Sequence, residues 1–264
     1  MYQNILTNLP ASYPWRENLH YFESIDSTNT AAKEMAAHGA PEGTVLVADM
    51  QTGGRGRMGR SFYSPAGCGI YMSVILRPRC PATQLMHLTC AVAVAAANAI
   101  ETATGLRPGI KWTNDLVLRR RKLGGILTEL SLDKKGCVDY AILGIGINCC
   151  QSEEDFPEEI RSIATSLQLC AETPIDRAAV TVSLLESLAL MNRTLLDPAV
   201  FLPRYRKDCI TLGQQISILR GDEVRHATAL DVDDQGALVV LFEDGHTETV
   251  TSGEVSIRGM YGYV

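Results

Sequence analysis

The chain has 264 residues, of which 46% are hydrophobic and 20% are charged, and its net charge is −6. These values are typical of a globular protein with one or two domains, and they exclude disordered, collagen-like and disulfide-stapled chains. A dedicated nucleic-acid binder usually carries a basic surplus, so the acidic balance disfavours that class. The N-terminus lacks a basic start followed by an apolar run, which excludes a secretory signal.

Eight cysteines occur without a C-x-x-C pair, so a zinc ribbon and a thioredoxin-type motif are both disfavoured. We interpret Cys149 and Cys150 as buried structural residues rather than as a reactive pair. The longest apolar stretch, residues 90–100, is too short to span a bilayer. We therefore expect a cytoplasmic protein with free thiols and no membrane partner.

The first 210 residues alternate between strand-like and helix-like patterns. Short apolar runs bounded by glycine or proline predict strands, and longer amphipathic or Ala-rich stretches predict helices. Helices are expected at residues 30–38, 83–104, 173–195 and 198–207. Strands are expected at residues 43–48, 70–76, 110–112, 117–118, 125–130 and 140–147. This mixture predicts the α+β (α/β) class.

The pattern changes near Thr211 to short alternating strands separated by turns that contain glycine. These strands are expected at residues 215–219, 227–232, 237–242, 247–250 and 255–258. Such a run of short strands suggests a small SH3-like β-barrel. We therefore expect two domains, at residues 1–209 and 210–264.

The strongest local motif is Gly53–Arg60, which holds four glycines and three arginines. Glycines let the backbone approach a ligand closely, and arginines offer forked donors to carboxylate or phosphate. Taken alone, the segment could equally be a flexible solvated loop. It is neither a P-loop nor a dinucleotide-binding fingerprint, because both glycine spacings are absent.

A second motif is Lys111-Trp112-Thr113-Asn114-Asp115, followed by Lys122 in front of a glycine pair. Asp115 can hold Mg²⁺ and Asn114 can hydrogen-bond a ligand. Lys122 can neutralise a reacting carboxylate and phosphate. Taken singly, a surface turn and a solvated lysine are the commoner readings of these residues.

Two further segments carry weaker signals. Gly144–Asn148 reads as a strand with two glycines, which indicates either a close backbone contact or a bulge. The hydroxyl-rich turn at residues 24–29 precedes a predicted helix, and plain helix capping explains it as well as ligand binding does.

Together these motifs resemble the biotin protein ligase family. The order D-S-T-N, Q-x-x-G-R-G-R-x-G-R, K-W-x-N-D, K-x-x-G-I-L, G-I-G-I-N matches the family from about Tyr21 onward, and the tail matches as well. Thr113 and Gly53 stand where proline and alanine are usual, and Met58 lies inside the arginine loop. The resemblance implies a catalytic domain shared with lipoate ligases, built on a mixed sheet, with a small C-terminal SH3-like β-barrel.

The resemblance also implies ATP-dependent attachment of biotin to one lysine of a carboxyl-carrier domain, through biotinyl-5′-AMP. The implied catalytic residues are Lys122, Arg57 and Asp115, with Asp115 also as a magnesium ligand. The implied biotin-binding residues are Ser27, Thr28, Asn29, Gln51, Arg55, Gly56, Arg57 and Lys122. The implied nucleotide-binding residues are Arg57, Arg60, Lys111, Asn114, Asn148 and Arg258, with Glu254 as a weaker candidate.

The expected partners are therefore biotin, ATP, Mg²⁺ and the biotin carboxyl-carrier domain of a carboxylase, while homodimer formation stays open. One alternative is a lipoate or octanoyl ligase of the same fold, although those carry an R-R-x-x-G-G-G-x-V type of loop. Another is a biotin-responsive repressor. Because D-S-T-N begins at Asp26, no room is expected for an N-terminal DNA-binding domain, and no DNA partner is expected.

Charge is segregated along the chain. Three arginines lie within residues 53–60, and six basic residues lie within residues 107–122. From Thr211 onward, the chain contains nine acidic residues and only three arginines. We expect a basic catalytic face that suits anionic ligands such as ATP, and an acidic C-terminal domain.

Overall fold

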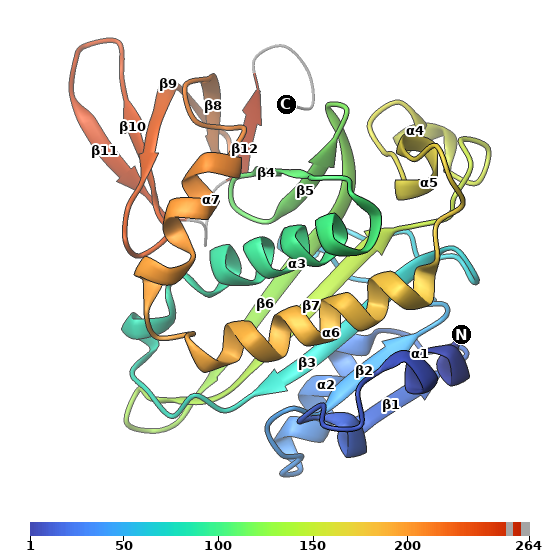
Figure 1. Ribbon diagram of the computed structural model, residues 1–264. Coiled ribbons are helices and arrows are strands. Elements are labelled where there is room, and N and C mark those ends of the chain that lie inside the picture. Colours follow the sequence, from blue (N-terminus) through green and yellow to red (C-terminus); the bar gives the residue numbers. More distant parts are fainter. Residues whose placement is uncertain (252–255, 260–264) are drawn as a thin grey trace.

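The computed structural model describes residues 1–251 and 256–259, the last four by their backbone only. A seven-stranded mixed sheet forms its centre (Figure 1), in the order β1-β2-β3-β7-β6-β5-β4. The strands are β1 (Leu19–Phe22), β2 (Val45–Ala48), β3 (Gly69–Leu76), β4 (Gly109–Lys111), β5 (Asp115–Leu118), β6 (Arg121–Leu132) and β7 (Val138–Asn148). Strands β1 and β2 are parallel, and the remaining pairs are antiparallel.

Helices cover both faces of this sheet. They are α1 (Tyr2–Asn8), α2 (Thr28–Ala37), α3 (Leu88–Thr104), α4 (Glu158–Arg161), α5 (Leu167–Cys170), α6 (Arg177–Arg193) and α7 (Leu202–Asp208). Short 3₁₀ turns lie at Arg16–Asn18, Arg57–Gly59, Ala82–Leu85 and Pro198–Val200. Helices α3 and α6 run side by side over one face (Figure 1), and α2 packs on the opposite face in a separate apolar cluster.

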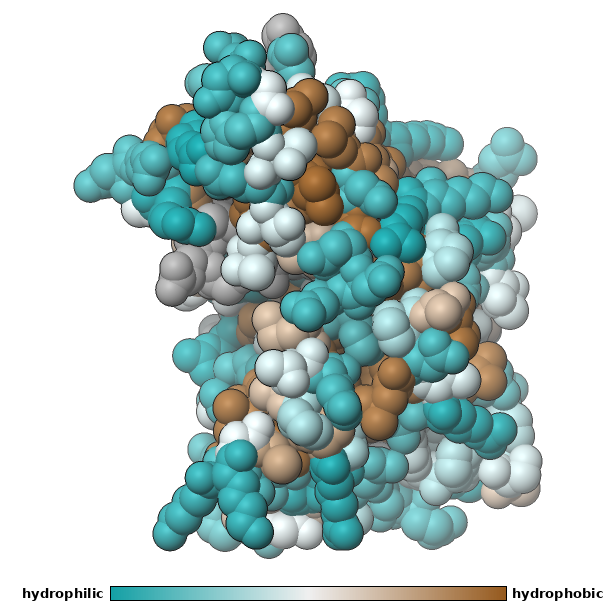
Figure 2. Space-filling model, turned by 90° about the vertical axis from the view of Figure 1, so that its left-hand side faces the viewer, coloured by the Kyte–Doolittle hydropathy of each residue, from teal (hydrophilic) through white to brown (hydrophobic). Residues whose placement is uncertain are grey.

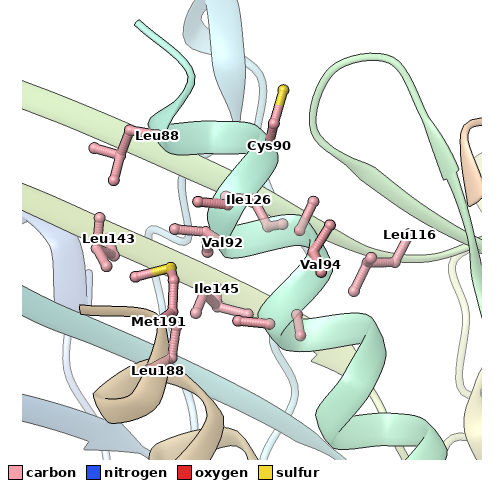
Figure 3. Packing of buried hydrophobic residues seen from close by; sticks show 14 of the residues in the cluster. Leu88, Cys90, Val92, Val94, Leu116, Ile126, Leu143, Ile145, Leu188 and Met191 are labelled. Atoms are coloured by element: carbon pink, nitrogen blue, oxygen red, sulfur yellow. The ribbon is translucent and has the colours of Figure 1, made fainter. Parts of the chain in front are cut away.

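The main core lies between the sheet and helices α3 and α6. Ile126, Leu143 and Ile145 of the sheet point toward Val92 of α3 and Leu188 of α6 (Figure 3). Side chains alternate along a strand, so the residues between these isoleucines and leucines face the other side. Gly125 of β6 and Gly144 and Gly146 of β7 therefore face the α2 side of the sheet, where the cavity described below opens.

The segment Ala82–Thr104 is long and apolar enough to cross a membrane by length and composition. Most of it is buried inside the fold, because α3 packs against both the sheet and α6. It is therefore the core helix of the domain. The predicted helix at 83–104 is confirmed, with its first turn formed as 3₁₀ helix.

The C-terminal region forms a second, antiparallel sheet in the order β11-β10-β9-β8-β12. Its strands are β8 (Gln215–Arg220), β9 (Glu223–Val232), β10 (Leu238–Leu241), β11 (Thr247–Val250) and β12 (Ser256–Gly259). Figure 2 shows the side of the molecule that carries this sheet, where hydrophobic side chains lie among mainly hydrophilic ones. A mixed-sheet catalytic-type domain followed by a small antiparallel β domain confirms the predicted fold class.

Helices α1 and α5 and the edge strand β1 lie outside the sequence prediction. All three are short, and α1 buries Ile5 but little else, so no clear apolar periodicity marks it. Strand β6 also begins earlier than the predicted 125–130, because pairing with β5 extends the strand back to Arg121.

All eight cysteines are free. Cys149 is fully buried, and burial raises the pKa of its thiol well above the ordinary range. Burial also raises the pKa of the half-buried Cys150 thiol. Thiols of this kind are poor nucleophiles, which agrees with the interpretation of the pair as structural residues.

Candidate functional site

A cavity of about 520 Å³ opens on the α2 face of the sheet. Its walls are the start of α2, the loop at residues 51–63, strands β5 to β7, and the segment at residues 156–164. The predicted site residues that line it are Ser27, Thr28, Asn29, Gln51, Arg55, Gly56, Arg57, Arg60, Lys111, Asn114, Asp115, Lys122 and Asn148. Five motifs that are distant in the sequence thus meet in one cavity. Glu254 and the side chain of Arg258 lie outside the described residues.

The start of α2 supplies the first group of polar side chains. Ser27 is the N-cap residue, and its Oγ accepts a hydrogen bond from the Thr30 N–H at 3.4 Å. Capping turns the chain so that Thr28 and Asn29 enter the first helical turn beside the sheet, where both are buried. Capping and lining of the cavity are therefore combined in one turn.

An uncharged hydrogen-bond network fixes these side chains. The Thr28 N–H and hydroxyl both donate to Gln51 Oε1, at 2.9 and 3.1 Å, and Gln51 Nε2 donates to Ser64 Oγ at 3.0 Å. The fully buried Ser73 hydroxyl lies 2.8 Å from Thr28 Oγ1 and 2.6 Å from Asn29 Oδ1. The network holds hydroxyl and amide groups in fixed orientations at one end of the cavity.

The glycines of β7 make room for this end of the cavity. A Cβ on Gly144 would overlap Asn29 Oδ1, and a Cβ on Gly146 would overlap the Phe62 ring. Asn29 Nδ2 in turn donates to Glu129 Oε2 at 3.0 Å. Of the two readings of the glycine-containing strand, close contact is therefore correct, since β3, β7 and β6 pair without a break at these positions.

The arginine loop forms a second wall. Gly56 N–H donates to Arg60 O at 2.7 Å and closes a short turn in which Met58 has a left-handed φ of 55°. Arg57 points inward and donates through Nη1 to Asn114 Oδ1 at 2.9 Å. Burial lowers the pKa of Arg57, while the nearby Asp115 carboxylate opposes that shift. A largely desolvated guanidinium thus lies on the cavity wall.

Charged groups gather at the β5–β6 end of the cavity. Lys122 Nζ donates to Asp115 Oδ1 at 2.7 Å, and Asn114 Nδ2 donates to the same oxygen at 3.2 Å. The side chains of Lys122 and Asp115 are 31% and 18% exposed, so a ligand can still reach this ion pair. The described lining residues include five cations and one carboxylate, Asp115, so the cavity wall has a net positive charge.

Asn148 lies at the end of β7 and is almost fully buried. Its Nδ2 donates to Thr165 O at 3.0 Å, and its Oδ1 accepts from Gln151 Nε2 at 3.3 Å. The carbonyl oxygen of the buried Gln151 side chain has no partner among the described residues. Asn148 therefore joins the cavity to the segment that follows β7.

Sequence reasoning missed the apolar part of the lining. Phe62, Phe156, Ile160 and Ile163 all face the cavity. The acidic residues at 153–159 by themselves indicate a surface loop or a helix start, and α4 begins at Glu158. Phe156 among these acids, and Ile160 and Ile163 after them, were the signal that one side of this segment lines a cavity.

The basic cluster at residues 107–122 contributes less to the cavity than its charge suggests. Arg107 pairs with Glu101 and Asp208, and Arg119 donates to the carbonyls at the end of α5, so neither lines the cavity. Of the six basic residues, only Lys111 and Lys122 line it. The basic face expected from the sequence is therefore smaller than predicted, because most of this cluster lies outside the cavity.

No group of three or more His, Cys, Asp or Glu side chains arranged for a metal ion occurs in the part of the chain that the structure describes. A site built from protein ligands alone is therefore absent there. Mg²⁺ commonly binds through one or two carboxylates together with substrate phosphates and water. Asp115, the one carboxylate on the described wall, fits that arrangement.

Comparison with known proteins agrees with this geometry. Residues 21–148 match the biotin/lipoate A/B protein ligase family, and residues 211–258 match the biotin protein ligase C-terminal domain. The bifunctional ligase/repressor BirA of Bacillus subtilis is 38% identical over 232 residues, which are 87% of this chain and 71% of that protein. The biotin–[acetyl-CoA-carboxylase] ligase of Mycobacterium tuberculosis is 32% identical over 249 residues, covering 91% and 89%.

A solved structure of similar fold is the biotin protein ligase from Aquifex aeolicus in complex with biotin and ATP. It superposes with a TM-score of 0.78 at 30% sequence identity, over 92% of this chain and 99% of that one. The family matches and this likeness in fold cover the mixed-sheet region and the C-terminal β region alike. The chain belongs to the biotin protein ligase family.

Proposed function

We propose that the chain attaches biotin to a lysine of a biotin carboxyl-carrier domain, with ATP as the energy source and biotinyl-5′-AMP as the intermediate. The observation that carries this proposal is one cavity with two unlike ends. The α2 end offers fixed neutral donors and acceptors, and the β5–β6 end offers Lys122 and Arg57 beside the Asp115 carboxylate. The first end suits the ureido ring of biotin, and the second suits a carboxylate next to a triphosphate.

In the first step, a biotin carboxylate oxygen attacks the α-phosphorus of ATP. The new bond joins the carboxylate oxygen to phosphorus, and the bond to the β-phosphate oxygen breaks, so pyrophosphate leaves. Lys122 and Arg57 offset the negative charge that otherwise keeps the two anions apart. Arg60 and Lys111, which the resemblance assigns to the nucleotide, and Arg55, which it assigns to biotin, add positive charge to the cavity wall.

In the second step, the amine of the acceptor lysine attacks the acyl carbon of the mixed anhydride. An amide forms, the bond between the acyl carbon and the phosphate oxygen breaks, AMP leaves, and the amine loses a proton to solvent. The apolar side chains Phe156, Ile160 and Ile163 limit the access of water to the anhydride before transfer.

Magnesium would bind at Asp115 together with ATP phosphate oxygens, and it would neutralise phosphate charge there. Asp115 also holds Lys122 at 2.7 Å, so this carboxylate keeps the lysine oriented toward the anions. Asn114 orients the same carboxylate through its side-chain amide.

The uncharged network favours biotin over lipoate or an octanoyl chain. A site built to hydrogen-bond a substrate discriminates strongly against an analogue that lacks the matching groups. An octanoyl chain or a dithiolane ring offers neither the N–H nor the carbonyl group of a ureido ring to Thr28 and Gln51. The repressor activity named for the Bacillus relative is not part of this proposal.

The proposal includes a division into a catalytic domain at residues 1–209 and a second domain at residues 210–264. In support, the first strand of the second sheet begins at Gln215, and the C-terminal family match begins at residue 211. A cytoplasmic location, where carboxylases and ATP occur together, is part of the same proposal.

The test of this function is label transfer. Purified chain is incubated with labelled biotin, ATP, Mg²⁺ and an isolated biotin carboxyl-carrier domain, and the label on that domain is counted. We expect ATP-dependent labelling that disappears when the acceptor lysine is replaced by arginine. Labelling that is independent of ATP, or that persists without the acceptor lysine, would overturn the proposal.

A further inference from the structure

The turn between β4 and β5 carries much of the charged end of the cavity. Lys111 precedes this turn, and Asn114 and Asp115 follow its first two residues, Trp112 and Thr113. Asn114 holds Arg57, and Asp115 holds Lys122. Any shift of the turn therefore moves the groups that face the phosphates.

Three elements from the last quarter of the chain fix this turn from behind. The Trp112 N–H donates to Thr211 Oγ1 at 2.9 Å, and the Trp112 indole N–H donates to Gly236 O at 3.0 Å. The Tyr205 hydroxyl donates to Thr113 O at 3.2 Å. Trp112, Thr113, Tyr205 and Thr211 are all buried, so these hydrogen bonds are shielded from water.

The C-terminal anchors are themselves held in place. Arg206, next to Tyr205 in α7, donates to Val232 O at 2.8 Å and pairs with Asp234 at 3.1 Å. Gly236 has a φ of +81°, and a Cβ there would lie 2.9 Å from Cys90 Sγ at the start of α3. In Figure 1, α7 lies between the C-terminal sheet and the β4–β5 turn. The second sheet and α7 thus form one support.

We propose that Tyr205, Thr211 and Gly236 are positioning residues for the nucleotide end of the site, acting through the main chain of Trp112 and Thr113 and through the Trp112 indole. This inference rests on the proposed function. None of the three lines the cavity. None bonds to the network of Thr28 and Gln51. Their loss therefore weakens the handling of ATP and leaves recognition of the biotin ring unchanged.

The chain offers a matched pair of tyrosines for the test. Tyr13 is also buried, and its hydroxyl donates to Leu185 O at 3.2 Å, far from the cavity. Tyr205→Phe and Tyr13→Phe each remove one buried hydroxyl of the same geometry, so they carry a similar cost in stability. A merely structural role for Tyr205 predicts the same kinetics for both variants.

The experiment is biotin-dependent ATP–pyrophosphate exchange with separate titrations of ATP and biotin, alongside melting temperatures. We expect Tyr205→Phe to raise the KM for ATP about fivefold, with the KM for biotin within about twofold, and Tyr13→Phe to leave both values unchanged. A Tyr205→Phe variant with an unchanged KM for ATP, or with equal rises in both KM values, would overturn the inference.

A second pair keeps the inference testable if the tyrosine variants fold poorly. Gly236→Ala presses the turn onto Cys90, whereas Gly245→Ala introduces the same left-handed strain at φ +87° with no atom within 4 Å. We expect the ATP-specific change for Gly236→Ala alone. If the wild type is active but Gly236→Ala and Gly245→Ala do not differ in the KM for ATP, only the positioning role is overturned. If the wild type itself shows no biotin-dependent exchange, the proposed function is overturned as well.

Discussion

At the α2 end of the cavity, polar side chains are buried and bond to one another, whereas at the β5–β6 end the charged side chains stay partly exposed. Ser73 is fully buried between Thr28 and Asn29, while the Lys122 side chain is 31% exposed. A neutral ring is recognised by groups whose orientation is fixed before binding. Phosphates are recognised largely by charge, which tolerates more freedom at the ends of long side chains. The two ends therefore respond differently to substitution.

Removal of Lys122 gives the largest expected effect. Lys122→Ala leaves the charge of the two reacting anions uncompensated and lowers the rate of adenylate formation by about 100-fold. Single-turnover formation of biotinyl-5′-AMP measures this rate. Lys134→Ala, at an exposed lysine of the β6–β7 turn, is the control and should behave as wild type. An unchanged rate in Lys122→Ala would remove this lysine from the mechanism.

The next effect concerns the neutral end alone. Gly144→Ala forces a Cβ into Asn29, whose amide is held on both sides, and we expect a loss of biotin affinity of about 30-fold. Titration calorimetry with biotin and with a non-hydrolysable ATP analogue measures both ends of the cavity. Equal losses for the two ligands would contradict the separation of the cavity into two ends.

Arg57→Ala removes the cation that reaches Asn114. We expect retention of the adenylate to weaken by more than about tenfold, or 1.4 kcal/mol. Arg57→Lys should recover only part of this loss, because an ammonium group lacks the planar fork of the guanidinium. The dissociation rate of biotinyl-5′-AMP is the readout, and a wild-type rate in Arg57→Ala would show that this arginine is not a ligand contact.

The smallest effect is expected for the buried hydroxyl of Ser73. Ser73→Ala removes the bridge between Thr28 and Asn29, and we expect the KM for biotin to rise about fivefold at constant KM for ATP, because one buried hydrogen bond contributes about 1 kcal/mol. Ser183→Ala in α6 loses a comparable bond to Ala99 O, remote from the site, and serves as the control. The same KM for biotin in both variants would contradict the positioning of these groups by Ser73.

Much of the site could be predicted from the sequence because its compact local motifs, taken together and in order, resemble those of a known family. Gly53–Arg60 and Lys111–Asp115 each combine charged side chains with a turn, and all their predicted site residues line the cavity. The alternation in Gly144–Asn148 also has a local cause, since isoleucines face the core and glycines face the cavity. Such signals depend on the backbone within a few residues.

The parts that could not be predicted depend on contacts between distant residues. Ser73 is an unremarkable serine inside an apolar strand until β3 brings it to Asn29. Tyr205 and Gly236 act across 92 and 124 residues of sequence, so no spacing rule finds them. For Arg107 the local signal was misleading. Its place in a basic cluster suggested a site residue, but its side chain pairs with Asp208 of α7 and does not line the cavity.

The most direct test of the central claim is ATP–pyrophosphate exchange driven by different acids. The account predicts exchange with biotin and rates lower by at least about 100-fold with lipoate or octanoate at equal concentration, since those acids lack partners for the network at α2. Exchange with lipoate or octanoate that equals or exceeds exchange with biotin would contradict it.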